Sequence, residues 1–435
     1  MKKILVIGYV WPEPASSAAG SHMMSILRLF KQQNWQVEFA SPAQQTEHSI
    51  ELAAEGISAK SIALNCDSFD VYIADYKPDI VMFDRFMMEE QFAWRVEKNC
   101  PDALKILDTE DLQCLRYARQ QTLKAGREFT HDHLTHEITH DLTTADLFND
   151  IVTHDIVKHD IAKREIAAIF RCDIALIISS YEMQLLTDVF KVDASLLHYL
   201  PFMVDLNKCP QKTVGFSERE HFVSIGNFRH APNWDMVLYL QKIWPLIRQK
   251  IPRAECHIYG AYTPPKATAL NNPKSGFLIK GRAQNGLAVM ENCRVCLAPI
   301  RFGAGIKGKL LDAMIMQTPS VTTSLGSEGM YQPRQDVWPG EIADEAQAFA
   351  NAAIKLYNDE STWLTAQQHA SDLLKRRYDS SVLGKELIDK ILATGATLKQ
   401  HRLNNFTGAM LKHHSMMSTQ YMSQWIAEKN RNNPV

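Results

Sequence analysis

Basic residues and glycines gather in the stretch RFGAGIKGKLLDAM, residues 301–314. Gly303 and Gly305 let the backbone approach a ligand closely and turn N–H groups toward it. Arg301 and Lys307 supply full positive charges, and the pattern IKGKLLDAM predicts a helix whose N-terminus adds a partial positive charge. Amides and cations in this arrangement are suited to bind a diphosphate.

An ordinary turn is the alternative for this stretch. Lys309 would then be a surface residue paired with Asp312, three positions further along the predicted helix. However, the preceding sequence CRVCLAPI predicts a buried strand, so the glycines lie between a strand and a helix. Open parallel sheets bind ligands at that position, outside the carboxyl ends of their strands. The context therefore favours the diphosphate site.

A second short turn indicates the same chemistry. Gly226 and Asn227 directly follow the apolar run HFVSI, and Arg229 and His230 come next, before a predicted helix. A backbone turn with a cation at the end of a parallel strand can make a further phosphate contact. An ordinary strand–helix loop is an equally good interpretation of these four residues.

The elements that must position these residues form two series of strands and helices. The predicted strands of the first half are 3–10, 36–41, 79–84, 104–109 and 174–179. Those of the second half are 221–228, 255–262, 276–281, 293–300 and 319–324. Continuous apolar strands separated by helices are typical of parallel sheets covered on both faces. We therefore predict an α/β protein with two Rossmann-like, doubly wound domains facing one another across a cleft, a natural site for a nucleotide.

The predicted boundaries follow from composition and periodicity. We expect an N-terminal domain at 1–200, a linker with two prolines at 201–218 and a C-terminal domain at 219–394. The Met-rich tail at 395–435 is expected to be a helix that packs back across the cleft. Docking on a membrane is the alternative, and the attraction would be weak because only Lys412 and Lys429 are basic within residues 406–430.

A helical insert is expected at about 126–170, where histidines recur: His131, His133, His136, His140, His154 and His159. His136 and His140 would lie one helical turn apart, which is compatible with a metal site. A pair of amphipathic helices is the favoured interpretation, with isoleucines inward and the histidines on the polar face.

Composition excludes several classes of protein. The 435 residues are too many for one core, and 46% hydrophobic with 22% charged residues is typical of a globular protein. Because 47 basic residues stand against 49 acidic ones, general nucleic-acid binding is not expected. No apolar run is long enough to cross a bilayer, so at most peripheral membrane contact is expected. The short apolar run 4–10 favours a buried first strand over a signal peptide, and we expect a cytoplasmic protein.

The cysteines are scattered along the chain. Cys293 and Cys296 have the spacing of half a zinc site, but no second Cys or His pair is near them in the sequence. Free thiols in the core of a cytosolic protein are the favoured interpretation. We therefore predict neither a metal site nor a cofactor.

The motifs of the second half resemble a known family. The segments GNFRHAPNWD, GFLIKGRAQN, CRVCLAPIRFGAGIKGKLLDAM and PSVTTSLGSEGM are similar to the donor-binding half of the retaining GT-B glycosyltransferases of family 4. The segments 108–120 and 163–186 are similar to the N-terminal half. This resemblance covers nearly the whole chain. It implies a GT-B architecture and a nucleoside-diphosphate-sugar donor.

The resemblance also assigns roles to single residues. It implies that the donor diphosphate is held by four residues of the basic stretch: Gly303, Gly305, Lys307 and Arg301. It implies that Asp312 holds the ribose hydroxyls and that Gly226 and Asn227 face the phosphates. It implies that the base is lined by a loop of three residues: Lys280, Gly281 and Arg282.

The sequence departs from the family pattern in two features, a pair of glutamates and a histidine. Most of the family has a pair of glutamates in this region, whereas this chain has Ala304 at the first position and the shorter Asp312 at the second. Many relatives carry histidine at the position of Gln113, where it reaches toward the transferred sugar. The sequence therefore does not identify the sugar.

The acceptor is expected to enter from the first domain. Small residues leave room for a ligand in the loop after the first strand: Ser16, Ser17 and Gly20. Carboxylates at two further strand ends could orient an acceptor hydroxyl: Asp84, beside Arg85, and Glu110 with Asp111. Helix caps or salt bridges are the alternative roles for these carboxylates.

The sequence thus predicts a transferase that moves a sugar from a nucleoside-diphosphate donor to an unidentified acceptor hydroxyl, with retention implied by the resemblance alone. Arg301, Lys307 and backbone N–H groups would stabilise the charge that grows on the departing diphosphate, without a metal. A nucleotide-sugar epimerase and a catalytically silent nucleotide-sugar-binding protein are the alternatives.

Overall fold

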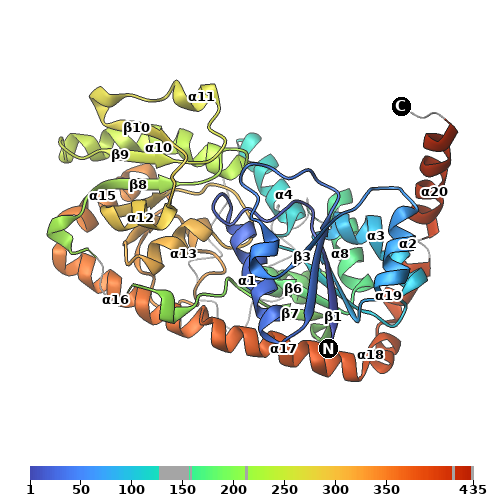
Figure 1. Ribbon diagram of the computed structural model, residues 1–435. Helices are drawn as coiled ribbons and strands as arrows, with labels where there is room; N and C mark the ends of the chain where they lie inside the picture. Colours follow the sequence, from blue (N-terminus) through green and yellow to red (C-terminus); the bar gives the residue numbers. More distant parts are fainter. Residues whose placement is uncertain (127–155, 157–158, 211–213, 414–416, 433–435) are drawn as a thin grey trace.

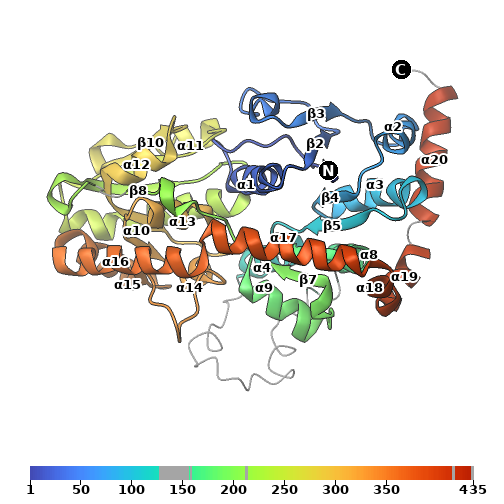
Figure 2. The same ribbon diagram turned by 60° about the horizontal axis from the view of Figure 1, so that its bottom comes forward.

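The computed structural model describes residues 1–126, 156, 159–210, 214–413 and 417–432 (Figure 1). Two parallel sheets, each packed between helices, lie side by side in the molecule (Figures 1 and 2). The predicted fold class, two Rossmann-like α/β domains, is confirmed.

The first sheet has seven strands in the order β3-β2-β1-β4-β5-β6-β7. Its strands are β1 (Lys3–Ile7), β2 (Gln36–Ser41), β3 (Ser58–Ser61), β4 (Ile80–Asp84), β5 (Leu104–Asp108), β6 (Ile174–Ile177) and β7 (Leu197–Tyr199). Every residue of β4, β5 and β6 is buried. Helices cover both faces of these strands, which explains their continuous apolar sequences.

The first domain's helical segments connect these strands. They are α1 (Ala18–Gln32), η1 (Leu52–Glu55), α2 (Ser68–Tyr76), α3 (Phe86–Asn99), α4 (Gln113–Lys124), α8 (Asp160–Arg171), α9 (Ser180–Gln184), η2 (Leu185–Val189) and η3 (Ala194–Leu196). Between the domains, η4 (Leu206–Lys208) and η5 (Phe216–Glu218) are single turns.

The second sheet has six strands in the order β10-β9-β8-β11-β12-β13. Its strands are β8 (Glu220–Ile225), β9 (Cys256–Tyr259), β10 (Phe277–Gly281), β11 (Cys293–Ala298), β12 (Ser320–Thr322) and β13 (Gly340–Ile342). Its helical segments are α10 (Ala231–Lys250), α11 (Pro265–Thr268), η6 (Pro273–Ser275), α12 (Gly286–Asn292), α13 (Gly308–Ile315), α14 (Ser324–Ser327), α15 (Ala346–Asn358) and α16 (Glu360–Arg377).

Three strands were not predicted, and all three lie at the edges of their sheets. β3 and β7 are the two edges of the first sheet, and β13 is one edge of the second. All four residues of β3 are exposed, and β7 and β13 have only three residues each. An edge strand needs no continuous apolar run, so no hydrophobic pattern indicated these elements.

The chain crosses between the domains twice, and the two crossings bond to one another. The Val204 N–H donates to the Tyr378 carbonyl at 2.7 Å, and the Ser380 N–H donates to the Val204 carbonyl at 2.9 Å. After the second crossing, α17 (Ser380–Ala396) runs along the first domain (Figure 2). Its apolar side chains join the core around β1, and they are Leu383, Leu387, Ile388 and Ile391. The sequence analysis had placed this segment with the C-terminal domain.

The C-terminal tail lies on the far edge of the first domain. We had expected it to pack back across the cleft between the domains instead. Its helices are α18 (Leu398–Asn404), α19 (Phe406–Leu411) and α20 (Met417–Asn432), and both views place them at the side away from the second domain. The reason is a polar clamp: the Arg402 Nε and Nη2 atoms each donate to the Asp173 carboxylate at 2.8 Å. Asn405 Nδ2 donates to the Phe170 carbonyl at 2.7 Å. Because of these bonds, the tail packs against α8 and then against α3.

Most of the histidine-rich segment, with the proposed His136 and His140 pair, lies outside the described residues. His159 is described, and its Nδ1 accepts the Ile161 N–H at the start of α8. Ile156 is buried, and Ile161 and Ile166 pack against the first domain's core. No helix among the described residues has the length and apolarity needed to span a membrane.

Candidate active site

The glycine-rich stretch lies at the interface between the domains. It connects the carboxyl end of β11 to α13, which begins at Gly308 with Lys307 as its N-cap. Gly305 has φ of 63°, and a Cβ atom placed on it would lie 2.9 Å from the Asp111 Cβ of the first domain. A Cβ atom on Gly308 would lie 2.4 Å from the Ala18 Cβ. Glycine at both positions therefore permits the close approach of the two domains.

Two buried side chains of the first domain hold this stretch in place. The Glu182 Oε1 atom accepts the Gly305 N–H at 2.7 Å and the Leu112 N–H at 3.1 Å. Arg119 donates to the Gly303 carbonyl at 2.9 Å and forms a bidentate ion pair with Glu328 of the second domain, at 2.7 and 2.8 Å. The sequence analysis assigned none of these three residues, Glu182, Arg119 and Glu328, to the site. The position of Glu182 after a predicted strand was the available signal.

Burial shifts the pKa values of Glu182 and Arg119. Burial and, less strongly, the neighbouring Asp111 raise the pKa of Glu182 to about 8, although the two N–H groups that donate to Glu182 act in the opposite direction. Burial lowers the pKa of Arg119, but the Glu328 carboxylate outweighs this effect and keeps the guanidinium charged. The ion pair is therefore a charged link between the domains that is almost entirely shielded from solvent.

Lys307 lies among these interface groups. Its Nζ donates to the Gly305 carbonyl at 3.0 Å. Burial lowers its pKa to about 8, while Glu328 and Glu182 act in the opposite direction. The ammonium group is thus largely charged at neutral pH, and it lies beside the amides at the start of α13.

Arg301 points elsewhere. Its Nε and Nη2 atoms donate to the Asp235 carboxylate on α10 at 3.0 and 2.5 Å. Its guanidinium lies 4.7 Å from the centre of the Tyr239 ring, on the same helix. An acidic partner on α10 thus holds the guanidinium in this structure, and the role of Arg301 alongside Lys307 in the diphosphate site stays a prediction.

Lys309 and Asp312 lie on α13, facing α10 and the core of the second domain. Lys309 Nζ donates to the Asn233 Oδ1 at 2.5 Å and does not form the predicted pair with Asp312. Burial raises the pKa of Asp312 to about 7, and Lys309 partly offsets this rise. Asp312 is therefore poised to donate or accept a hydrogen bond near neutral pH.

The first domain presents a row of carboxyl groups at the ends of β4 and β5. The Asp84 Oδ2 atom accepts the Tyr9 N–H at 3.0 Å, and the Arg85 N–H donates to the Asp108 carbonyl at 2.7 Å. Arg85 and Glu110 have left-handed φ angles of 70° and 57°. Non-glycine residues in this conformation carry strain, which is often found at functional sites.

Some buried polar atoms of this row lack a hydrogen bond among the described residues, although Arg85 Nε and Asp84 Oδ1 form an ion pair at 3.7 Å. Asp84 Oδ1, Arg85 Nε and Asp108 Oδ2 are buried and make no hydrogen bond within the described part of the protein. Burial, together with the neighbouring carboxyl groups, raises the pKa of Asp108 to about 7 and that of Glu110 well above its usual value.

Asp111 differs from its neighbours. Burial raises its pKa, but Arg116, with which it forms an ion pair, and the nearby His230 and Arg85 together hold the pKa below its usual value. Asp111 is thus ionised at neutral pH and in contact with Gly305. The structure brings this carboxylate directly against the glycine-rich stretch.

The loop after β1 packs tightly and leaves no room at its small residues. Ser17 accepts the Gly20 N–H at 3.0 Å and caps α1, and the Ser16 hydroxyl is buried without a partner among the described residues. A Cβ atom on Gly20 would lie 2.6 Å from the Glu13 backbone. Glu13 in turn accepts a hydrogen bond from Tyr262 of the second domain at 3.1 Å. The small residues therefore permit close packing rather than an open space.

The turn after β8 lies near that contact. Asn227 Oδ1 accepts the Arg229 N–H at 2.8 Å, and Gly226 packs closely against Asn233. The Arg229 guanidinium lies 3.6 Å from the centre of the Tyr262 ring. The predicted base loop is more open. Its residues are Lys280 and Arg282, which are both exposed, and Gly281, which has φ of 74° and no other atom within 4 Å of its Cβ position.

The two positions that depart from the family pattern also lie near the interface. The Gln113 N–H donates to Glu165 at 2.8 Å, and its side-chain Nε2 lies 3.6 Å from the Met87 sulfur. Ala304 packs against the apolar core of the first domain.

Among the described residues, one group of side chains could hold a metal ion, but it lies at the opposite end of the second sheet. His221, Glu255 and His257 have donor atoms within 4.8 Å of one another, at the amino ends of β8 and β9. The His221 Nδ1 already accepts the Glu255 N–H at 3.3 Å. Cys293 and Cys296 are buried free thiols, as the sequence predicted.

Comparison with known proteins gives the fold its name. A structure of sucrose-phosphate synthase from Thermosynechococcus elongatus aligns with a TM-score of 0.61 at 14% identity, covering 91% of this chain and 100% of that one. HepE from Anabaena, solved with UDP and glucose, aligns with a TM-score of 0.63 at 11% identity, covering 90% and 100%. A glycosyltransferase from Rickettsia africae aligns with a TM-score of 0.60 at 10% identity, covering 89% and 97%.

The chain has the GT-B fold. In addition, residues 219–359 match the family described as glycosyl transferases group 1. This match covers the second GT-B domain, including the glycine-rich stretch. A comparison with curated protein sequences found no match.

Proposed function

We propose that this protein transfers a sugar from a nucleoside-diphosphate sugar to an acceptor hydroxyl at the interface of its two domains. The observation that carries the proposal is the contact of Gly305 with Asp111, beside Lys307. This contact places backbone amides and an ammonium group from the second domain against acidic side chains from the first. Both sets of groups lie where the parallel strands of their sheets end. The family match of the second domain and the UDP in the HepE structure support a nucleotide-sugar donor.

Lys307 and the first N–H groups of α13 would bind the donor diphosphate. A helix N-terminus and an adjacent ammonium group favour an anion. A bound diphosphate would also favour the charged form of Lys307, whose pKa burial lowers to about 8. We leave Arg301 out of this contact, because Asp235 holds it. Asp312, on the same helix, would bind the ribose hydroxyls.

Asp111 would orient the acceptor hydroxyl. Its carboxylate is ionised, whereas burial and the Asp108 carboxyl group raise the pKa of Glu110 well above its usual value and so favour its protonated form. An ionised carboxylate accepts a hydrogen bond from the attacking hydroxyl, and a protonated one can donate a hydrogen bond to the sugar. The two neighbouring carboxyl groups thus have different roles in this proposal.

Charge develops on the nucleoside diphosphate as the glycosidic bond breaks. Lys307 and the amides at the start of α13 would stabilise that charge without reorganisation, because Arg119 and Glu182 already fix the stretch. We extend the proposal to retention of anomeric configuration, which the family resemblance implies, and to catalysis without a metal ion, since Lys307 and the amides would supply the positive charge.

A thermal-shift screen of nucleoside diphosphates and their sugars tests donor binding, followed by assays for sugar transfer and donor hydrolysis. A ligand at a hundred times its Kd stabilises the folded state by about 2.7 kcal/mol, which such a screen detects. The expected result is stabilisation by one nucleoside diphosphate and its sugar, and its loss in Lys307→Ala. Isomerised sugar without acceptor would identify an epimerase. Binding without transfer or hydrolysis would identify a silent binding protein.

A further inference from the structure

The C-terminal helices expose an unusual number of large apolar side chains. Seven of these side chains lie within 403–425: Leu403, Phe406, Met410, Met417, Tyr421, Met422 and Trp425. Phe406 is 76% exposed and Trp425 is 61% exposed. We call the outward surface of α18, α19 and α20 the tail surface. Apolar side chains gathered in this way mark an interaction site more often than chance exposure does.

Helix α20 carries its aromatic residues on the outside and a buried serine on the inside. Tyr421, Trp425 and Lys429 are spaced by four residues, so they lie along one face, and the Lys429 ammonium lies 5.4 Å from the centre of the Trp425 ring. Ser423, on the opposite face, is buried and accepts a hydrogen bond from Arg95 at 3.1 Å. A helix that only covers a core turns its large apolar side chains inward, whereas α20 turns its aromatic side chains outward.

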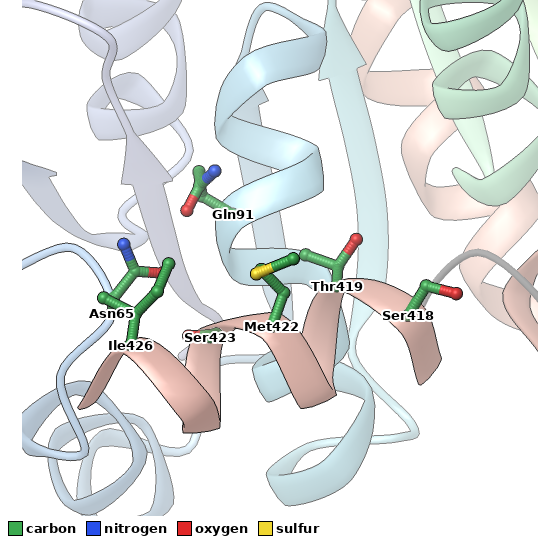
Figure 3. A pocket seen from close by; sticks show the side chains of 7 residues that line it. All are labelled: Asn65, Gln91, Ser418, Thr419, Met422, Ser423 and Ile426. Atoms are coloured by element: carbon green, nitrogen blue, oxygen red, sulfur yellow. The ribbon is translucent and has the colours of Figure 1, made fainter. Parts of the chain in front are cut away.

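The inward face of α20 does not fill the space beneath it. A hollow of about 290 Å³ lies between α20 and the first domain. Figure 3 shows the side chains that line it, with Asn65 and Gln91 on the side of the first domain. From α20 it is lined by Ser418, Thr419, Met422, Ser423 and Ile426. Apolar burial against the first domain thus contributes little to holding α20, and its aromatic side chains remain free to contact another surface.

The charge of the tail indicates what that surface is. Residues 396–432 contain five basic residues and one acidic residue, although the whole chain has a net charge of -2. Arg402 and Lys412 face the acidic Asp173 and Glu97, while Lys399 and Lys429 are exposed. Exposed aromatic side chains with nearby lysines are typical of helices that lie in the interface of an anionic bilayer. A symmetric contact between two copies would instead bring these lysines close to one another.

We propose that the tail surface docks the protein on a membrane that contains anionic phospholipid. Phe406, Tyr421 and Trp425 would enter the headgroup region, and Lys399 and Lys429 would contact lipid phosphates. This interaction goes beyond the proposed sugar transfer and is independent of it, because no residue of the tail surface belongs to the interdomain site.

Flotation of the full chain with vesicles tests the proposal. One set of vesicles is phosphatidylcholine alone, and the other is phosphatidylcholine mixed with phosphatidylglycerol. We expect stronger binding to the mixed vesicles at low salt. Trp425→Ser should weaken that binding about tenfold, because one large buried side chain is lost from the contact. Lys429→Glu should weaken binding by a similar factor, and only to the mixed vesicles.

Leu364→Ser is the matched control. Leu364 is an exposed apolar residue on α16, in the second domain, and its replacement should leave vesicle binding unchanged. Unfolding temperatures of all variants should equal that of the wild type, since the replaced side chains are exposed. Quenching of tryptophan fluorescence by iodide in the wild type gives a second measurement, and mixed vesicles should protect part of the signal.

Three outcomes would overturn the proposal. One is the absence of binding to either kind of vesicle at low salt. Another is an equal loss of binding in Leu364→Ser and Trp425→Ser. The third is concentration-dependent dimerisation in sedimentation velocity, abolished by Trp425→Ser, without vesicle binding, which would assign the tail surface to a second copy of the chain.

Discussion

Lys307 and Arg301 belong to one basic stretch of sequence, but they occupy different regions of the molecule. Lys307 lies in the inner region, where glycines bring the stretch against the first domain and where Arg119, Glu182 and Glu328 surround it. Arg301 lies in the outer region, where its guanidinium is paired with the partly exposed carboxylate of Asp235 on α10. The inner region is fixed by contacts between the domains, and the outer region belongs to the second domain alone.

This difference shows what a run of charges can and cannot indicate. Gly305 and Gly308 have a steric reason to be glycine, because each lies close to a residue of the other domain. A basic side chain is long and can pair with an acidic residue that is distant in the sequence. For Arg301 that residue is Asp235. If the inner region forms the site, variants there should strongly affect stability, activity or both, whereas variants of the outer region should affect neither strongly.

The largest effect is expected for Arg119→Ala. This change leaves the Glu328 carboxylate buried without its partner and removes the bond to the Gly303 carbonyl. Breaking a buried ion pair on one side costs about 3–5 kcal/mol in unfolding free energy, which urea denaturation measures. Arg28→Ala is the matched control, because Arg28 pairs with Glu55 near the surface and should lose at most about 1 kcal/mol. Equal losses in both variants would contradict the buried link between the domains.

Lys307→Ala should have the largest effect on catalysis. Removing one donor that stabilises the departing diphosphate costs about 2–4 kcal/mol in the transition state. Steady-state kinetics should therefore show a large fall in kcat/KM for sugar transfer, with unfolding free energy close to that of the wild type. Turnover equal to that of the wild type would remove the role proposed for this residue.

Gly305→Ala tests the steric part of the inner region. The left-handed φ of Gly305 and the nearby Asp111 Cβ, 2.9 Å from the new methyl group, should together cost about 1–3 kcal/mol. Donor binding in the thermal-shift assay should weaken in the same variant. Gly56→Ala provides the control, since Gly56 has a similar φ of 67° but only the flexible Lys31 side chain near its Cβ position, at 3.6 Å. Gly56→Ala should show the loss of stability without the loss of donor binding.

The sequence was sufficient to predict the two sheets, because their central strands are buried on both faces and have continuous apolar runs. It also placed the glycines of the inner region at a strand end, since glycines between a buried strand and a helix indicate a close approach of the backbone. It did not show that Glu182 and Arg119 hold this stretch. Both residues act across the interface on partners that are distant in the sequence, and no local pattern marks such a pair.

The direction of the C-terminal tail was unpredictable for a similar reason. Its exposed methionines and aromatic residues indicate that it contacts something, which we took to be the cleft. The clamp between Arg402 and Asp173 decides its course, and those two residues are far apart in the chain.

Glu182→Gln should change how stability depends on pH. Burial raises the pKa of Glu182 from its usual value to about 8, so between about pH 5 and 8 the unfolded state releases a proton that the folded state keeps. The stability of the wild type therefore falls as pH rises through that window, with a contribution from this one group on the order of 1 kcal/mol per pH unit. Glutamine keeps an acceptor for the Gly305 N–H but does not titrate. Urea denaturation at several pH values should thus show that the unfolding free energy falls less steeply with pH in the variant than in the wild type. If the two proteins gave parallel curves of unfolding free energy against pH, Glu182 would not titrate in this range.

Arg301→Ala should have the smallest effect, and it tests the comparison most directly. The ion pair with Asp235 is partly exposed, and such pairs contribute at most about 1 kcal/mol. Because the guanidinium is held on α10, its loss should leave donor affinity and kcat/KM nearly unchanged, in contrast to Lys307→Ala. A fall in kcat/KM as large as that of Lys307→Ala would mean that Arg301 leaves Asp235 when the donor binds. In that case the two regions would act as one site in the complex, as the sequence alone indicated.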